Sequence, residues 1–163
     1  MNQVGLPDDV PGRLYKMGMP GRFTELESDL KQMREAEVEL IVCLTPQDEM
    51  QAKSERYFEA VVDQKLGIEH VELPIEDQGV PVDVVDYERL VARVQDLLME
   101  GKSALVHCAA GIGRTGVFII SVLQNLGHET AEATEIARRA GSWPENNEQR
   151  AFLASRRSPD SVR

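Results

Sequence analysis

Residues 106–116 read VHCAAGIGRTG, and this stretch decides the fold. A short apolar run, Ala104–Val106, precedes its cysteine, and an apolar run with helical spacing, Val117–Leu123, follows it. A strand therefore delivers Cys108 into a glycine-bearing loop, and a helix begins where that loop ends. Such a loop can point several backbone N–H groups into one small space, where the helix N-terminus adds partial positive charge. Together with the planar guanidinium of Arg114, these groups predict a phosphate cradle with a cysteine at its base.

Strands alternate with helices along the rest of the chain. The expected strands cover residues 12–17 (a short edge strand), 38–44, 68–73 and 103–107. The expected helices cover residues 25–36 (with a capping box at Thr24 and Glu27), 53–65, 84–100, 117–126, 130–139 and 147–157. This alternation predicts an α/β fold, with a mostly parallel central sheet of about four to five strands and helices on both faces.

The chain length of 163 residues leaves room for one domain with a sizeable core. Residues 1–11 hold two prolines and a glycine, and they predict a flexible leader. Residues 12–157 are expected to form a single domain, and residues 158–163 a frayed tail. No internal repeat, low-complexity tract or inter-domain linker interrupts this pattern.

The charge balance limits the partners. Lys and Arg number 18 against 28 Asp and Glu, which gives a net charge of −10 and argues against a nucleic-acid or anionic-membrane binder. The most apolar stretch, Val117–Leu123, is too short to span a bilayer, and the N-terminus shows no secretory signal. The chain has two cysteines, which are too few for a framework of disulfide bonds. We therefore expect a cytoplasmic protein, and the sequence leaves its oligomeric state open.

The loops after residues 44, 73 and 107 all leave strands at the same edge of the predicted sheet. Ligands bind at that edge in parallel sheets, so the three loops are expected to converge on one site. A lone cysteine is usually a core residue, but the glycines, the arginine and the strand-to-helix setting together favour a functional Cys108. The loop lacks the Gly-Lys-Ser/Thr of a nucleotide-binding P-loop. No second cysteine or histidine pair stands at ligand spacing, so no metal site is expected.

Residues 107–116 resemble the signature loop of the cysteine-dependent protein tyrosine phosphatase superfamily. That pattern is His-Cys, two residues, Gly, two residues, Arg, Ser or Thr, Gly, and every fixed position is filled. The short chain and the order of its elements resemble the compact dual-specificity branch. The resemblance implies a tyrosine-phosphatase-like fold and a protein-tyrosine or dual-specificity phosphatase, a hydrolase that needs no cofactor.

The resemblance also implies roles for single residues. Cys108 attacks phosphorus and forms a phosphocysteine, and Thr115 donates a hydrogen bond to its sulfur. His107 orders the loop and helps to keep Cys108 ionised. Arg114 holds the phosphoryl oxygens together with the backbone amides of the loop, which belong to Ala109, Ala110, Gly111, Ile112, Gly113 and Arg114 itself.

The departing oxygen needs a proton, which a carboxylic acid on another loop must supply. In the family this acid is an aspartate on a mobile loop upstream of the cysteine, and Asp77 in the proline-bracketed loop 74–81 lines up with it. The alternative is a solvated acidic turn. One alignment with the family places Glu145 at the position that orients the attacking water and Gln149 at a second, less critical glutamine. Taken singly, each residue is better explained by a helix N-terminus capped by asparagine.

Cys43 ends the buried run of residues 40–44, where it is either a core residue or, as in some relatives, a redox partner that forms a disulfide with Cys108. Several arginines are either solvated or contacts for substrate at the rim: Arg13, Arg22, Arg138 and Arg139.

The filler positions of the loop bear on the substrate. Phosphatases that act on lipids tend to carry lysines at the positions held here by Ala109, Ala110 and Ile112. The uncharged residues therefore argue against a lipid substrate. The short chain implies a shallow pocket that admits phosphotyrosine as well as phosphoserine or phosphothreonine in proteins, or a small phosphate monoester. Two alternatives stay open: a phosphoinositide or inositol phosphate phosphatase, and a non-catalytic phospho-binding module.

Overall fold

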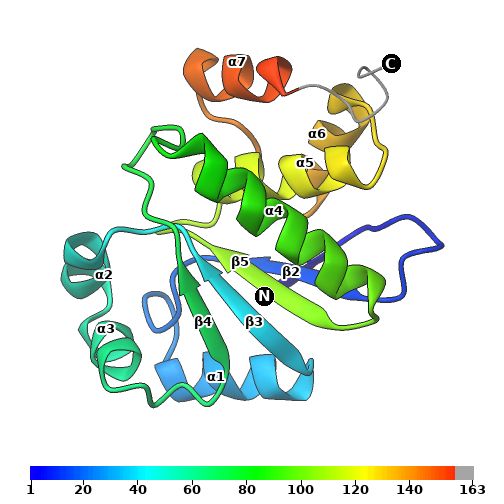
Figure 1. The fold of residues 1–163 in the computed structure, drawn as a ribbon. Helices are drawn as coiled ribbons and strands as arrows, with labels where there is room; N and C mark the ends of the chain where they lie inside the picture. Colours follow the sequence, from blue (N-terminus) through cyan, green and yellow to red (C-terminus); the bar gives the residue numbers. More distant parts are fainter. Residues whose placement is uncertain (157–163) are drawn as a thin grey trace.

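Five strands form one sheet in the computed structural model, which describes residues 1–156. The strands are β1 (Asn2–Val4), β2 (Arg13–Met17), β3 (Val38–Cys43), β4 (Glu69–Glu72) and β5 (Ser103–His107). Their order is β1-β2-β5-β3-β4, and every pairing is parallel except the antiparallel pairing of β1 with β2. Figure 1 labels the parallel strands β2, β5, β3 and β4. The predicted α/β class with a mostly parallel sheet is confirmed. The tail expected at residues 158–163 lies outside the described residues.

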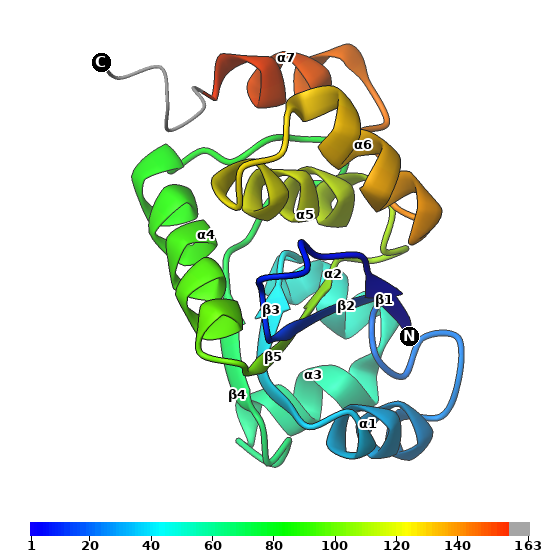
Figure 2. The same ribbon diagram turned by 90° about the vertical axis from the view of Figure 1, so that its right-hand side faces the viewer.

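Helices cover both faces of the sheet (Figure 2). One side carries α1 (Leu26–Glu35), α2 (Gln47–Lys53) and α3 (Glu55–Val62), and the other carries α4 (Val84–Met99), α5 (Gly113–Asn125), α6 (Thr130–Arg139) and α7 (Asn147–Ser155). In β3, Leu40 and Val42 face the α4 side whereas Ile41 and Cys43 face the α1 side. This double burial explains the continuous apolar run of β3. Among residues 1–156, no helix combines the length and apolar character that crossing a bilayer requires.

The N-terminal residues depart from the expectation of a loose leader. Asn2–Val4 pairs with β2 as an antiparallel edge strand, and the side chain of Val4 is fully buried. The side-chain amide of Asn2 also donates a hydrogen bond to the carbonyl of Ala140. As a result, β2 is an interior strand and not the edge strand that its sequence suggested.

The helix expected at residues 53–65 is instead two helices that meet at Ser54. α2 begins earlier than expected, at Gln47, and the hydroxyl of Ser54 donates a hydrogen bond to the carbonyl of Pro20 where the chain changes direction. The capping box before α1 is also absent, because the hydroxyl of Thr24 donates to the carboxylate of Asp29. The early start of α2 matters for the site, since it brings new side chains to the carboxyl end of β3.

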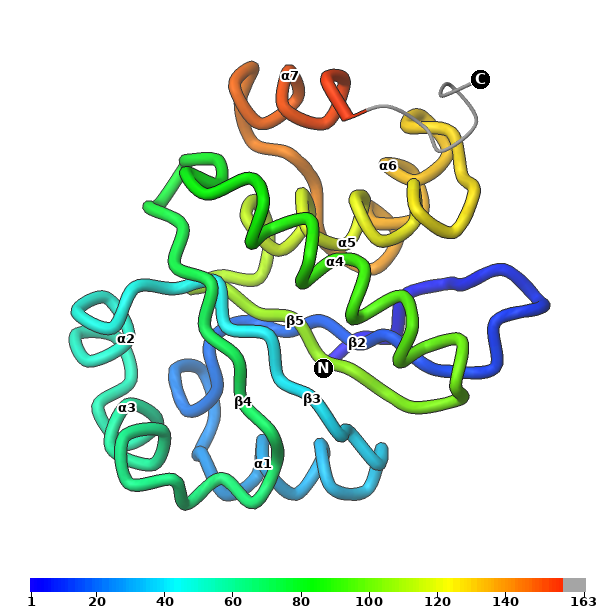
Figure 3. Tube along the Cα trace, in the orientation of Figure 1, coloured from blue at the N-terminus to red at the C-terminus, as the bar shows by residue number. Residues whose placement is uncertain are grey.

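The carboxyl ends of the parallel strands lie together, as the trace shows (Figure 3). Cys43 at the end of β3 is in register with His107 of β5 and with Glu72 of β4. From these ends the chain runs on toward α2, α4 and α5. The loops after the three strands therefore converge, as the sequence predicts.

Candidate active site

The loop between β5 and α5 turns sharply at Gly111, whose φ is +74°. A side chain at this position would collide with the backbone of Met17 and Gly18, so only glycine fits. The loop is thus pressed against the end of the neighbouring strand β2, and its shape is fixed by backbone contact.

The carbonyl groups of this loop are tied to its surroundings. The N–H of Met19 donates to the carbonyl of Ala109 over 3.1 Å. The hydroxyl of Ser142 donates to the carbonyl of Gly111 over 2.7 Å. Within residues 1–156, the N–H groups of residues 109–112 have no hydrogen-bond acceptor. Consecutive N–H groups without acceptors, at the start of a helix, form a site for an anion.

Arg114 is almost fully buried and is held by Glu49. Its two terminal nitrogens each donate to one carboxylate oxygen of Glu49 over 2.9 Å, and Nη1 also donates to the carbonyl of Ile75 over 2.8 Å. The hydrogen bonds from Arg114 lower the pKa of Glu49 to about 2. Burial alone lowers the pKa of Arg114, but the bonded carboxylate raises it overall, so both charges persist at neutral pH.

Two further charged groups complete the surroundings of Arg114. Lys53 Nζ lies 2.9 Å from a carboxylate oxygen of Glu49, which extends the network along α2. Asp77 Oδ1 lies 3.4 Å from Arg114 Nη2, and the side chain of Asp77 is 63% exposed. The exposed carboxylate of Asp77 is thus open to a substrate that binds beside Arg114.

Arg114, Lys53 and Asp77 line one cleft of about 220 Å³. Cys108, Arg114 and Asp77, which were expected to act together, all lie in its wall. The rim adds the cations Arg22 and Lys53. The other arginines suggested for the rim are elsewhere, since Arg13 begins β2 and Arg138 and Arg139 end α6.

His107 is a fully buried, neutral residue behind the loop. Burial lowers its pKa to about 3, so the imidazole is neutral at pH 7. Its Nδ1 donates to the carbonyl of Cys108 over 3.0 Å, which leaves Nε2 to accept from the hydroxyl of Tyr57 over 2.8 Å. His107 therefore orders the loop by hydrogen bonding and supplies no positive charge to the cysteine.

Thr115 and the two water-positioning candidates differ in their surroundings. The hydroxyl of Thr115 is buried and has no partner within residues 1–156, which leaves it free for the role that the resemblance implies. Glu145 lines the cleft. Gln149 is fully buried: it accepts from the N–H of Glu145 over 2.7 Å and donates to the carbonyl of Gly79 over 3.2 Å. Asn146 caps α7, as the alternative interpretation proposed.

Sequence reasoning missed Glu49 and Gln78. Gln78 lines the cleft and donates to the carboxylate of Glu145 over 3.3 Å. A buried arginine needs a carboxylate partner, but the choice of Glu49 depends on the position of α2, which the sequence did not indicate.

Cys43 and Cys108 are free thiols that belong to hydrophobic clusters on opposite faces of the sheet. The Cys43 thiol donates a long hydrogen bond, 3.7 Å, to the carbonyl of Thr45, and burial raises its pKa to about 12. The described geometry thus gives no support to a Cys43–Cys108 disulfide, which stays a prediction.

Two known phosphatases are similar in sequence to part of this chain. Tyrosine-protein phosphatase 1 of Saccharomyces cerevisiae is 39% identical over 64 residues, which is 39% of this chain and 18% of that protein. Protein-tyrosine-phosphatase PTP1 of Arabidopsis thaliana is 32% identical over 79 residues, 47% of this chain and 23% of that protein. The chain thus matches less than a quarter of the length of either relative.

Solved structures share the fold at lower identity. A kinase associated phosphatase, crystallised with its catalytic cysteine changed to serine, superposes with a TM-score of 0.81 and 17% identity, covering 93% of this chain and 90% of that one.

A family model described as "Polymorphic toxin system, DSP-PTPase phosphatase" matches residues 15–128, which is more than half of the chain and includes the whole 107–116 loop. The chain belongs to this DSP-PTPase phosphatase family.

Proposed function

We propose that this chain hydrolyses phosphate monoesters, phosphotyrosine in proteins first, through a phosphocysteine intermediate on Cys108. One observation carries the proposal. A buried cysteine, an arginine held by three hydrogen bonds and a run of N–H groups without acceptors surround a single cleft, and an exposed aspartate stands at its edge. Membership in a phosphatase family supports the same reaction.

In the first step, the thiolate of Cys108 attacks phosphorus and the bond from phosphorus to the leaving oxygen breaks. The carboxylic acid of Asp77 gives its proton to that oxygen, so the alcohol or phenol departs neutral. Arg114 and the loop N–H groups hold the three remaining phosphoryl oxygens while charge redistributes. Because Glu49 already fixes the guanidinium, little reorganisation is needed at that moment.

In the second step, water attacks the phosphocysteine. The carboxylate of Asp77 takes a proton from the water, the phosphorus–sulfur bond breaks and inorganic phosphate leaves. The hydroxyl of Thr115 donates a hydrogen bond to the departing sulfur. Glu145, which lines the cleft, orients the water, and this is a better candidate than the buried Gln149.

The surroundings of the cleft also favour protein substrates over the alternatives. The loop positions 109, 110 and 112 carry uncharged residues, which suits a single phosphate group. Arg22 and Lys53 at the rim are placed to attract acidic residues beside a phosphotyrosine. The presence of the cysteine, the arginine and the aspartate together argues against a non-catalytic binding module. A reducing compartment such as the cytoplasm would keep Cys108 free.

The test is hydrolysis of p-nitrophenyl phosphate, followed by a panel of phosphotyrosine, phosphoserine and inositol phosphate substrates. Cys108→Ser should abolish turnover, and Arg114→Lys should nearly abolish it, since an ammonium cannot make the bidentate contact. Turnover of phosphotyrosine peptides ahead of the other substrates is the expected order. Full activity of Cys108→Ser would refute the mechanism, and a preference for inositol phosphates would replace the substrate class.

A further inference from the structure

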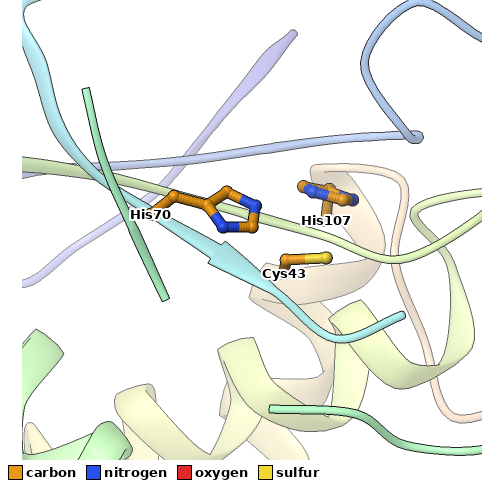
Figure 4. A group of neighbouring side chains, drawn as sticks. All are labelled: Cys43, His70 and His107. Carbon is orange, nitrogen blue, oxygen red and sulfur yellow. The ribbon is translucent and has the colours of Figure 1, made fainter. Parts of the chain in front are cut away.

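Three side chains that can bind a metal meet behind the catalytic loop, on neighbouring strands (Figure 4). Cys43 ends β3, His70 lies in β4 and His107 ends β5. Cys43 is in register with His107, and His70 lies two residues before Glu72, the β4 partner of Cys43. All three side chains therefore point to the same face of the sheet. Their candidate ligand atoms lie within 4.8 Å of one another.

The donor set suits one metal in particular. One thiolate and two imidazole nitrogens are the ligands that Zn²⁺ prefers, in a tetrahedral arrangement that a fourth oxygen ligand completes. Hard cations such as Mg²⁺ and Ca²⁺ prefer oxygen ligands, so the set selects against them. Sequence spacing gave no sign of this group, because its members come from three separate strands.

In both histidines, Nδ1 lies near an oxygen outside the cluster, as it does in imidazoles that bind a metal through Nε2. His107 donates from Nδ1 to the carbonyl of Cys108, which leaves the lone pair on Nε2 facing the cluster. His70 Nδ1 lies 3.9 Å from a carboxylate oxygen of Glu72. A carbonyl or carboxylate behind each imidazole orients the ring and strengthens its other nitrogen as a ligand.

The hydroxyl of Tyr57 now lies between the two histidines, 2.9 Å from Nε2 of His70 and 2.8 Å from Nε2 of His107. Since Nε2 of His107 accepts, the hydroxyl donates there and accepts from Nε2–H of His70. A metal ion would replace both hydrogen bonds. The proton on His70 would then move to Nδ1, where the carboxylate of Glu72 can accept it.

Of the three side chains, His70 is the one that is partly exposed, on the edge strand β4. A groove of about 620 Å³ runs along this edge of the sheet, and His70, Glu69 and Glu72 are part of its lining. Glu69 is ion-paired with Arg93, so Glu72 is the carboxylate of this lining that can attract a cation. His70 therefore joins the surface groove to the buried pair Cys43 and His107.

We propose that Cys43, His70 and His107 form a zinc site at the back of the catalytic loop, entered from the groove beside β4. On binding, the Cys43 thiol loses its proton to water, and the ion takes Nε2 of both histidines. The ion breaks the contact between Tyr57 and His107, the residue before Cys108, so occupancy slows the phosphatase reaction. Only this last consequence rests on the proposed function.

The chain has two cysteines, which makes a direct test possible. In the Cys108→Ser variant, Cys43 carries the only thiol group. A thiolate-to-cobalt charge-transfer band on titration with Co²⁺ must therefore come from Cys43. We expect this band, with the visible bands of tetrahedral cobalt, and its bleaching when Zn²⁺ is added. The band should vanish in Cys43→Ser/Cys108→Ser. Loss of a residue that only orients a metal ligand weakens metal affinity by about 10- to 100-fold. Adding His70→Gln, which removes a ligand itself, should weaken the cobalt affinity by at least as much.

The third histidine of the chain provides the matched control. His128 Nδ1 lies 2.8 Å from a carboxylate oxygen of Glu132, away from the cluster, so His128→Gln/Cys108→Ser should bind cobalt unchanged. Far-ultraviolet circular dichroism of each variant checks folding, and His70→Gln carries the test if Cys43→Ser unfolds. Absence of the charge-transfer band, or an equal affinity in the His70 and His128 variants, would overturn the site.

Inhibition is measured separately on the enzyme with Cys108 intact. Zn²⁺ should slow p-nitrophenyl phosphate turnover, a chelator should restore it, and His70→Gln should need at least about tenfold more zinc for the same effect. Equal inhibition of wild type and His70→Gln would refute the inhibitory consequence. Failure of the proposed function shows instead as a lack of turnover without zinc, while the cobalt band would still appear.

Discussion

Arg114 donates two parallel hydrogen bonds, each 2.9 Å long, to the carboxylate of Glu49. This contact joins the first turn of α5 to α2, a helix that begins at the carboxyl end of β3. It holds the plane of the guanidinium before any substrate arrives. Glu49 is thus a positioning residue, because it acts on the phosphate through Arg114.

Replacing Glu49 by Gln should lower kcat/KM for p-nitrophenyl phosphate by about 100-fold, since a misplaced guanidinium loses most of its effect on the transition state. Steady-state kinetics measures this loss. Asp48→Asn, a change at the exposed neighbour on α2, is the control and should keep full activity. Equal activity of Glu49→Gln and wild type would show that Arg114 needs no carboxylate to hold it.

Asp77→Asn should lower turnover in a way that depends on the leaving group. With phenyl phosphate the loss should be about 100- to 10,000-fold, the usual contribution of a general acid. With p-nitrophenyl phosphate it should be smaller, because that phenoxide leaves without full protonation. Glu76→Gln, one residue earlier on the same loop, is the control. An equal loss on both substrates would remove Asp77 from the role of acid.

Glu145 and Gln149 should separate a catalytic effect from a structural one. Glu145→Gln should slow hydrolysis of the phosphocysteine, so stopped-flow traces should show a burst of p-nitrophenol. Gln149→Met should instead lower the free energy of unfolding by about 1–3 kcal/mol, because two partly buried hydrogen bonds to the backbone are lost. Urea denaturation measures that change. A burst in Gln149→Met but not in Glu145→Gln would reverse the assignment.

The protonation of His107 makes folding stability depend on pH. Its pKa is about 3 in the folded protein and its ordinary value is 6.5, so between these values the unfolded chain binds the extra proton. The His107 contribution to stability is therefore complete above pH 6.5 and is lost as the pH falls toward 3. Nuclear magnetic resonance titration should find His107 neutral at pH 5, with the proton on Nδ1. Protonation of this ring near pH 6.5 would contradict the buried geometry.

Much of the architecture was visible in the sequence because local patterns carried it. The apolar run of β3 and the glycine-bearing loop after β5 each required one kind of structure, and both formed, although α5 begins at Gly113 and not at residue 117 as expected. The strand β1 was missed because three residues with one buried side chain leave no periodic signal. The break at Ser54 was missed because it depends on a contact with Pro20, more than thirty residues away.

The site was predictable only where one stretch of sequence contained it. Cys108 and Arg114 share a loop, so their meeting follows from the local fold. Glu49 comes from a helix that the sequence did not indicate, and its role depends on where α2 packs. The charge of His107 likewise depends on complete burial beneath Tyr57, which no local pattern encodes.

The most direct test of the account is a search for the phosphocysteine itself. Wild-type enzyme is quenched with acid during turnover of a phosphotyrosine peptide, and the digested protein is analysed by mass spectrometry. We predict phosphate on the peptide that contains Cys108, and none in Cys108→Ser treated in the same way. Continued turnover with no phosphate on Cys108, or phosphate on another residue, would contradict the proposed mechanism.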